Sequence, residues 1–258
     1  MRSLVLWSLA AVFSVGLTLL AFCPAAWMGS LLESSSAGRL TLGDPQGTLW
    51  RGSAFIGGAA SGRDPVTPLL PGRFSWSMSP LLLLGQVDIE LTNPEALSQP
   101  VNLTGSWTQW QLAPGSILLP AERLAGLGAP LNTMAPSGQM RLSWGLMQLA
   151  RQEKKVDVNG RITLDLNEIG SRLSPIKPLG TYQLVMDWSG QQAQVTLLTT
   201  KGPLLLSGAG SFNNGRFQFS GKAEAEAASE EKLANLLNML GRRRKDGDKN
   251  VIALEFSQ

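Results

Sequence analysis

The sequence predicts a mainly β protein. We expect a single membrane-spanning helix at the N-terminus, then an antiparallel β-rich region forming a meander, a groove or a sandwich, with one amphipathic helix near the C-terminus. Three observations lead to this prediction. Apolar and polar residues alternate over many short runs, residues typical of tight hairpins separate those runs, and an uncharged stretch of 20 residues lies close to the N-terminus. Alternation with period two places every second side chain on one face of a strand.

The uncharged stretch covers residues 3–22 and is rich in Leu, Val, Ala and Phe. At about 1.5 Å per helical residue it spans roughly 30 Å, the thickness of a bilayer's hydrocarbon core. We therefore expect residues 1–28 to form a short cytoplasmic stub and an uncleaved signal anchor. A cleaved secretory signal and a lipoprotein acylated at Cys23 are the alternatives. Pro24 argues against cleavage after the cysteine, and the bulky Phe22 argues against a lipoprotein signal.

Charges flanking this stretch predict its orientation. Arg2 precedes it, and the first charge after it is Glu33. Because positively charged flanks stay in the cytoplasm, the short N-terminal end is expected there and the bulk of the chain on the opposite side of the membrane.

The alternating runs predict strands with one dry face and one wet face. In the clearest run, Ile162, Leu164 and Leu166 alternate with polar residues. Comparable runs occupy residues 87–92, 140–144, 182–188, 217–219 and 252–256. Asn159-Gly160, Ser189-Gly190 and Asn213-Asn214-Gly215 lie between runs and contain residues that tolerate positive φ, so antiparallel hairpins are expected.

Pro- and Gly-rich connectors suggest how the β-rich part is divided. They occupy residues 62–72 and 112–120, and a longer irregular stretch covers residues 127–138. We place a boundary near Pro136, which separates a region over 29–136 from a second region over 137–258. One continuous domain is the alternative.

One helix is specified near residues 229–240. Ser229 is the expected N-cap, and Glu230 and Glu231 occupy the first turn, where the helix dipole favours anions. Gly241 is expected to end the helix. Its apolar stripe consists of Leu233, Leu236, Leu237 and Leu240.

A basic run follows this helix: Arg242, Arg243, Arg244 and Lys245. Structure alone can explain a basic run at this position, because positive charges are favoured beyond the negative C-terminal end of a helix dipole. Contact with anionic lipid or with an acidic partner is the functional alternative. The four leucines of the stripe and these four basic residues are our candidate interaction residues.

Composition excludes much familiar chemistry. The chain has no histidine and one cysteine, which removes Ser-His and Cys-His nucleophile pairs, internal disulfides and thiolate metal clusters. No phosphate-binding loop or dinucleotide motif is present. The net charge of +3 equals the local balance of five basic and two acidic residues over 242–249, so a basic nucleic-acid surface is not expected. We assign no catalytic, cofactor-binding or metal-binding residue. The carboxylate pairs Asp165/Glu168 and Glu224/Glu226 are interpreted as solvated.

Several short motifs occur in a specific order. The N-terminal span is followed by Gly-Thr-Leu-Trp-Arg-Gly at residues 47–52, then by Trp76 and the leucines of 81–84. Later motifs are Leu-Ser-Pro at 173–175, Leu-Gly-Thr-Tyr at 179–182, Gly-Pro-Leu-Leu-Leu-Ser-Gly at 202–208, Phe-Ser-Gly-Lys-Ala at 219–223 and Leu-Leu-x-x-Leu-Gly ending at 241. In this order the chain resembles the type II secretion system protein N (GspN) family of the general secretion pathway.

The resemblance implies a non-enzymatic, single-pass accessory component of the bacterial inner membrane. Its periplasmic β domain would contact other type II secretion subunits, and no cofactor or active-site residue is implied. The family is also similar to AsmA-like envelope proteins, whose β-rich parts form grooves linked to lipid transport. Lipid binding or transfer is therefore the alternative function, because the alternation is the same for a packed core and for an apolar groove.

Overall fold

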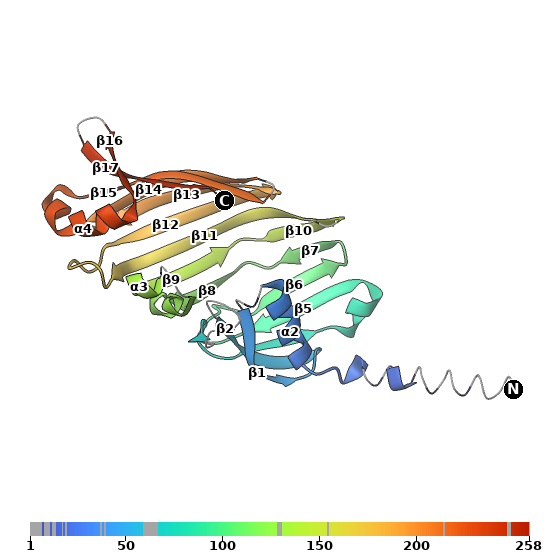
Figure 1. The fold of residues 1–258 in the computed structure, drawn as a ribbon. Coiled ribbons are helices and arrows are strands. Elements are labelled where there is room, and N and C mark those ends of the chain that lie inside the picture. Colours follow the sequence, from blue (N-terminus) through green and yellow to red (C-terminus); the bar gives the residue numbers. More distant parts are fainter. Residues whose placement is uncertain are drawn as a thin grey trace.

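The computed structural model describes residues 7, 11, 14–16, 18, 20–36, 38, 40–58, 67–127, 131–153, 155–213, 215–246 and 249–257. Within them the chain forms one antiparallel sheet of 17 strands with short helices at its margins (Figure 1). The prediction of a mainly β, antiparallel fold is confirmed.

Each alternating run of the sequence lies in a strand. The strands are β1 (Leu40–Gly47), β2 (Arg51–Gly58), β3 (Thr67–Pro68), β4 (Phe74–Met78), β5 (Gln86–Thr92), β6 (Val101–Ser106), β7 (Gln109–Leu112), β8 (Gly115–Pro120), β9 (Pro136–Trp144), β10 (Met147–Gln152), β11 (Lys155–Ser171), β12 (Gly180–Gly190), β13 (Gln192–Lys201), β14 (Leu204–Asn213), β15 (Arg216–Ala225), β16 (Arg242–Asp246) and β17 (Lys249–Ser257). The helices are α2 (Ala26–Ser35), η1 (Pro80–Leu84), η2 (Ala121–Leu127), α3 (Leu131–Met134), η3 (Ala227–Ser229) and α4 (Glu230–Leu240).

The sheet is a meander in which neighbours in sequence are mostly neighbours in space. Strands β7 and β8 are two parts of one interrupted long strand, and β9 and β10 are two parts of another. They pair in one register, from Gln109↔Ala150 to Pro120↔Gln139. The sheet therefore runs without a break through Pro136. A division into regions 29–136 and 137–258 stays a prediction about folding units.

The register gives the sheet one apolar face. Directly paired positions bring Ile117, Leu142, Leu164, Leu184 and Leu197 into a row that crosses five strands. Since side chains alternate along every strand, all five project from the same side of the sheet.

The opposite face is polar. Here the register aligns Arg161, Asp187, Gln194, Ser211 and Gln218 across β11 to β15. Arg161 also forms an ion pair with Asp187 at 2.5 Å. The alternation predicted from the sequence thus separates the two faces of the whole sheet.

Packed cores lie near the two ends of the strand order. Near β2, β4 and β5, Trp50, Ala54, Trp76 and Met78 pack with Ala25, which precedes α2. At the other end, α4 covers Leu179 and Leu204. The central strands lie between these cores.

Of the predicted stub and anchor over 1–28, the structure describes residues 7, 11, 14–16, 18 and 20–28. Among the helices of the described ranges, none has both the length and the apolar character needed to cross a bilayer. The chain forms an additional helix, α2, directly after the stretch and across the predicted start of the β region at residue 29.

Helix α4 lies where the sequence predicted a helix. Glu230 and Glu231 occupy its first turn, and Gly241 follows its last residue. Ser229 stands at the N-cap position, but its side chain makes no capping hydrogen bond. The basic run after α4 is a strand, β16, because its backbone pairs with β17.

Candidate functional site

The turn between β1 and β2 (residues 47–52) fixes the end of the apolar N-terminal stretch to the sheet. The indole Nε1–H of Trp50 donates to the carbonyl oxygen of Leu20 at 2.9 Å. The Leu49 N–H donates to the Cys23 carbonyl at 2.7 Å, and the Ala25 N–H donates to the Gly47 carbonyl at 3.2 Å. We call these residues the junction. Three hydrogen bonds therefore tie Leu20, Cys23 and Ala25 to this turn.

Two glycines make this turn possible. Gly47 has φ +84°, and a Cβ there would lie 2.5 Å from the Arg51 carbonyl oxygen. A Cβ on Gly52 would lie 2.5 Å from the ring of Trp76. Trp76 in turn donates its Nε1–H to the Leu49 carbonyl at 3.0 Å. The Gly-Thr-Leu-Trp-Arg-Gly motif is therefore a tightly packed connection to the N-terminal stretch.

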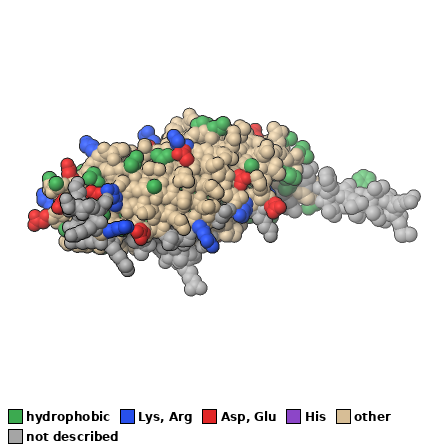
Figure 2. Space-filling view, turned by 90° about the horizontal axis from the view of Figure 1, so that it is seen from above, with side chains coloured by type: hydrophobic (Ala, Val, Ile, Leu, Met, Phe, Trp, Pro, Cys, Tyr) green, Lys and Arg blue, Asp and Glu red, His purple; other side chains and the backbone are tan. Residues whose placement is uncertain are grey.

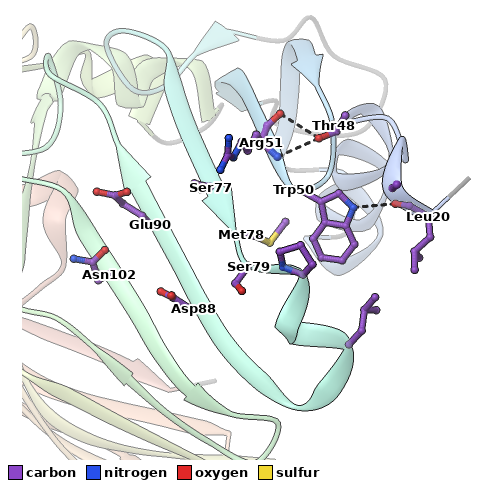
Figure 3. Close-up of a pocket in the computed structure, with 13 residues that line it drawn as sticks. Leu20, Thr48, Trp50, Arg51, Ser77, Met78, Ser79, Asp88, Glu90 and Asn102 are labelled. Carbon is purple, nitrogen blue, oxygen red and sulfur yellow. Dashed lines mark hydrogen bonds between the residues drawn. The ribbon is translucent and has the colours of Figure 1, made fainter. Parts of the chain in front are cut away.

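A cavity of about 740 Å³ lies beside the junction (Figure 3). Leu20, Trp50, Met78 and Leu83 form much of its apolar wall. The polar side chains that line it are Thr48, Arg51, Ser77, Ser79, Asp88, Glu90 and Asn102. Figure 3 shows Asp88, Glu90 and Asn102 on neighbouring strands, away from Trp50 and Leu20. The cavity combines an apolar wall at the N-terminal stretch with a polar wall on the sheet.

The middle of the apolar face is the second notable surface. Leu142, Leu164 and Leu184 are only half-buried although their row is entirely apolar. They belong to none of the packed clusters found among the described residues. Ile162 and Met186, in the next row, share this environment. The described part of the chain supplies no second layer over these strands, so the face is open in its centre.

The junction motif and most of the sheet lie within residues 38–251, and only the end of β17 extends beyond them. Residues 38–251 match the family model described as Type II secretion system (T2SS), protein N. The chain belongs to this family. No curated protein and no solved structure matches it. The resemblance inferred from the order of motifs is confirmed, and the protein is a component of the type II secretion system.

The predicted interaction leucines are part of the protein's own core. Leu233 is 0% exposed and Leu236 is 3% exposed, and both pack against Leu179 and Leu204. Leu237 is partly buried against the same cluster. The side chain of Leu240 lies outside the described residues. A partner would reach Leu233 and Leu236 only after α4 left the sheet, so their role in binding stays a prediction.

The basic run is placed on the last hairpin of the sheet. The Arg244 side chain is exposed, and its Nη1 lies 4.0 Å from Oε1 of Glu255 across the β16–β17 pair. The side chains of Arg242, Arg243 and Lys245 lie outside the described residues. Figure 2 shows acidic and basic side chains close to one another on the face in view, without an extended patch of one sign in its described part.

The carboxylates considered in the sequence analysis do not converge. Asp165 accepts a hydrogen bond from Gln183 at 2.8 Å, and Glu224 pairs with Lys222 at 2.9 Å. In the part of the chain that the structure describes, no three acidic, histidine or cysteine side chains are grouped as metal ligands would be. Asp165 and Glu224 are thus bound to local partners on the polar face.

Among the described residues, two ionisable groups have shifted pKa values. Burial raises the pKa of Tyr182, whose hydroxyl donates to the Leu204 carbonyl at 3.1 Å. The hydrogen bond and charge of Asp187 raise the pKa of the exposed Arg161. Arg161 and Asp187 are directly paired across β11 and β12, and neither Tyr182 nor Arg161 lies at the junction.

Sequence reasoning missed the junction. The motif at 47–52 was noticed only as part of a family pattern, although its two glycines and one tryptophan signalled a close packing contact. Its partner residues are Leu20, near the end of the apolar stretch, and Cys23, directly after it, and no internal pattern there points to a contact.

Proposed function

We propose that the protein is an inner-membrane accessory component of the type II secretion system. Residues 3–22 serve as a single uncleaved anchor, and the sheet lies on the periplasmic side, where it acts by contact with other secretion subunits. The observation that carries this proposal is the junction. A segment that only directed export would not need a sheet turn bonded to Leu20 and Cys23.

The arrangement of the strands extends this proposal. Figure 1 places the N-terminal segment at one end of the strands and α3 and α4 at the other end. An 11-residue strand such as β12 is about 36 Å long at ~3.3 Å per residue. The β16–β17 hairpin therefore extends away from the anchored end. Because the basic run then lies away from the bilayer, we favour an acidic protein partner over anionic lipid.

Strand addition is the contact that β16 can offer. Among the described strands, β16 pairs with β17 on one side only. An unpaired edge presents backbone N–H and C=O groups to a partner strand. The residues of β16 are mainly basic, so we propose an extended acidic segment of another secretion subunit as the added strand.

Photocrosslinking in cells tests this contact. Benzoylphenylalanine at Arg244 is expected to capture a secretion subunit in envelope extracts. The matched control is Arg216, an exposed arginine at the start of β15. No capture at 244, or equal capture at both positions, contradicts the proposed contact. An alkaline phosphatase fused after Gln258 is expected to be active, and inactivity contradicts the proposed topology.

A second function is favoured by the open apolar face. The side chains of Leu142, Leu164 and Leu184 offer no hydrogen-bonding group. A peptide backbone buried there would lack hydrogen-bond partners, whereas an acyl chain needs none, so this face suits acyl chains better. We propose lipid binding at this face as the alternative mode of action.

Two adjacent positions of β12 test it. Leu184 lies in the apolar row, while Val185 is half-buried on the opposite face. A photocrosslinker at 184 is expected to yield a lipid adduct detectable by mass spectrometry, and the same group at 185 is expected to yield none. Adducts at both positions or at neither position contradict lipid binding.

A further inference from the structure

Four exposed apolar side chains form a surface that neither the family nor the proposed contacts explain. Leu81, Leu83 and Leu84 of η1 are 45%, 48% and 83% exposed, and Trp107 is 56% exposed. We call these residues the leucine patch. Large apolar side chains grouped at the surface mark contact with a protein or a membrane.

The leucine patch is rigidly held. Ser79 Oγ accepts a hydrogen bond from the Leu81 N–H at 3.3 Å, and Gly85 ends the turn with φ +94°. The Trp107 Nε1–H donates to the Leu82 carbonyl at 2.6 Å and so joins the β6–β7 hairpin to η1. Leu82 packs against the core around Trp76. Folding accounts for Leu82, whereas its three leucine neighbours in η1 stay exposed.

The patch lies next to the junction. Pro80 and Leu83 line the same cavity as Leu20 and Ala21, the end of the apolar N-terminal stretch (Figure 3). If residues 3–22 span the bilayer, Leu20 is within about 3 Å of its surface, since a helix rises ~1.5 Å per residue. Because Pro80 and Leu83 line the same cavity as Leu20, η1 then lies close to that depth.

We propose that the leucine patch inserts into the periplasmic surface of the inner membrane and holds this end of the sheet against the bilayer. This inference depends on the proposed anchor. Exposed leucine and tryptophan side chains are typical of segments that lie at the boundary between headgroups and acyl chains. The charged side chains of the adjoining cavity are Arg51, Asp88 and Glu90, so no basic excess attracts anionic lipid there. Insertion is therefore driven by apolar burial and is independent of lipid charge.

Spin labels on the full-length protein in lipid nanodiscs test the proposal. The single cysteine, Cys23, is replaced by alanine, and a label is attached in turn at Val15, Leu84 or Leu198. Val15 lies in the predicted anchor, and Leu198 is an exposed leucine of β13, 53% accessible, on the polar face. The collision rates of each label with oxygen and with a water-soluble nickel complex report its immersion. Circular dichroism checks that each variant is folded.

The label at 84 is expected to favour oxygen, as the label at 15 does, whereas the label at 198 favours the nickel complex. The result is expected to be the same in phosphatidylcholine alone and with phosphatidylglycerol added. A lipid-exposed label at 15 with a water-exposed label at 84 overturns the inference and leaves the anchor intact. A water-exposed label at 15 overturns the anchor itself. Immersion at 84 only with phosphatidylglycerol present, or equal immersion at 84 and 198, also overturns the inference.

Discussion

Trp50 and Leu20 are 30 positions apart in the chain and are joined by a hydrogen bond of 2.9 Å from the indole Nε1–H to the carbonyl oxygen. Trp50 is 9% exposed, so its indole N–H has little access to water. A buried donor without a partner would cost about 1–3 kcal/mol. This bond therefore couples the position of the N-terminal stretch to the folding of β2.

Replacing Trp50 by phenylalanine is expected to loosen the junction. The variant keeps an aromatic ring but loses the donor, so the backbone contacts around Leu20 are weakened by about 1 kcal/mol. Hydrogen exchange of the Ala25 and Leu49 amides should accelerate about fivefold. Trp144→Phe is the control, because Trp144 donates in the same way to the distant Ala113 carbonyl at 2.8 Å. Equal effects of both variants at Ala25 and Leu49 would contradict a local junction.

Gly52→Ala is expected to destabilise the protein by overpacking. The new Cβ would lie 2.5 Å from the Trp76 ring and 2.8 Å from two carbonyl oxygens. Overpacking of this kind costs about 1–3 kcal/mol, which lowers the melting temperature by several degrees. Gly145→Ala should leave the melting temperature unchanged, because no atom lies within 4 Å of a Cβ there. A Gly52→Ala protein as stable as wild type would show that the turn is not tightly packed.

Leu233→Ala is expected to lower the free energy of unfolding by about 2–5 kcal/mol, because it leaves a cavity under α4. Leu233 is fully buried, whereas Met239 on the same helix is 65% exposed. Met239→Ala should change stability by less than ~0.5 kcal/mol. Denaturant titration of both variants measures the difference. Equal effects would mean that α4 does not pack on the sheet through its leucine stripe.

Tyr182→Phe tests the effect of burial on alkaline stability. Burial raises the pKa of Tyr182 in the folded state above the ordinary value of 10.0, so folding favours the neutral phenol. Its contribution is fully present below about pH 10 and is lost as the pH rises towards the folded-state pKa. Below pH 10 the variant should be less stable by about 1 kcal/mol, because the hydrogen bond to Leu204 is lost.

As the pH rises above about 10, the stability of the wild-type protein should approach that of the variant. Denaturant titrations at a series of pH values measure both curves. Tyr182 is the single tyrosine of the chain, so no other phenol contributes. Curves that stay parallel up to pH 11 would contradict the raised pKa.

The local pattern of the sequence indicated the strands that contain alternating runs and the helix near the C-terminus. Alternation in residues such as Ile162 and Leu164 set which side chains share a face, because a strand has only two faces. The leucines and the first-turn glutamates likewise indicated α4. The order of short motifs indicated the secretion family, which the family model confirms.

Only the tertiary structure decided how these elements meet. In the sequence the basic residues of β16 were interpreted only as a run that follows a helix, but backbone pairing with β17 makes them a strand. Leu233 and Leu236 were predicted as interaction residues, and only the tertiary structure shows that their side chains pack against Leu179 and Leu204. The contact of Trp50 with Leu20 depends on a turn that brings distant backbone groups together. Periodicity is a local property of the chain, whereas pairing and burial depend on residues far away in sequence, so no local pattern specifies them.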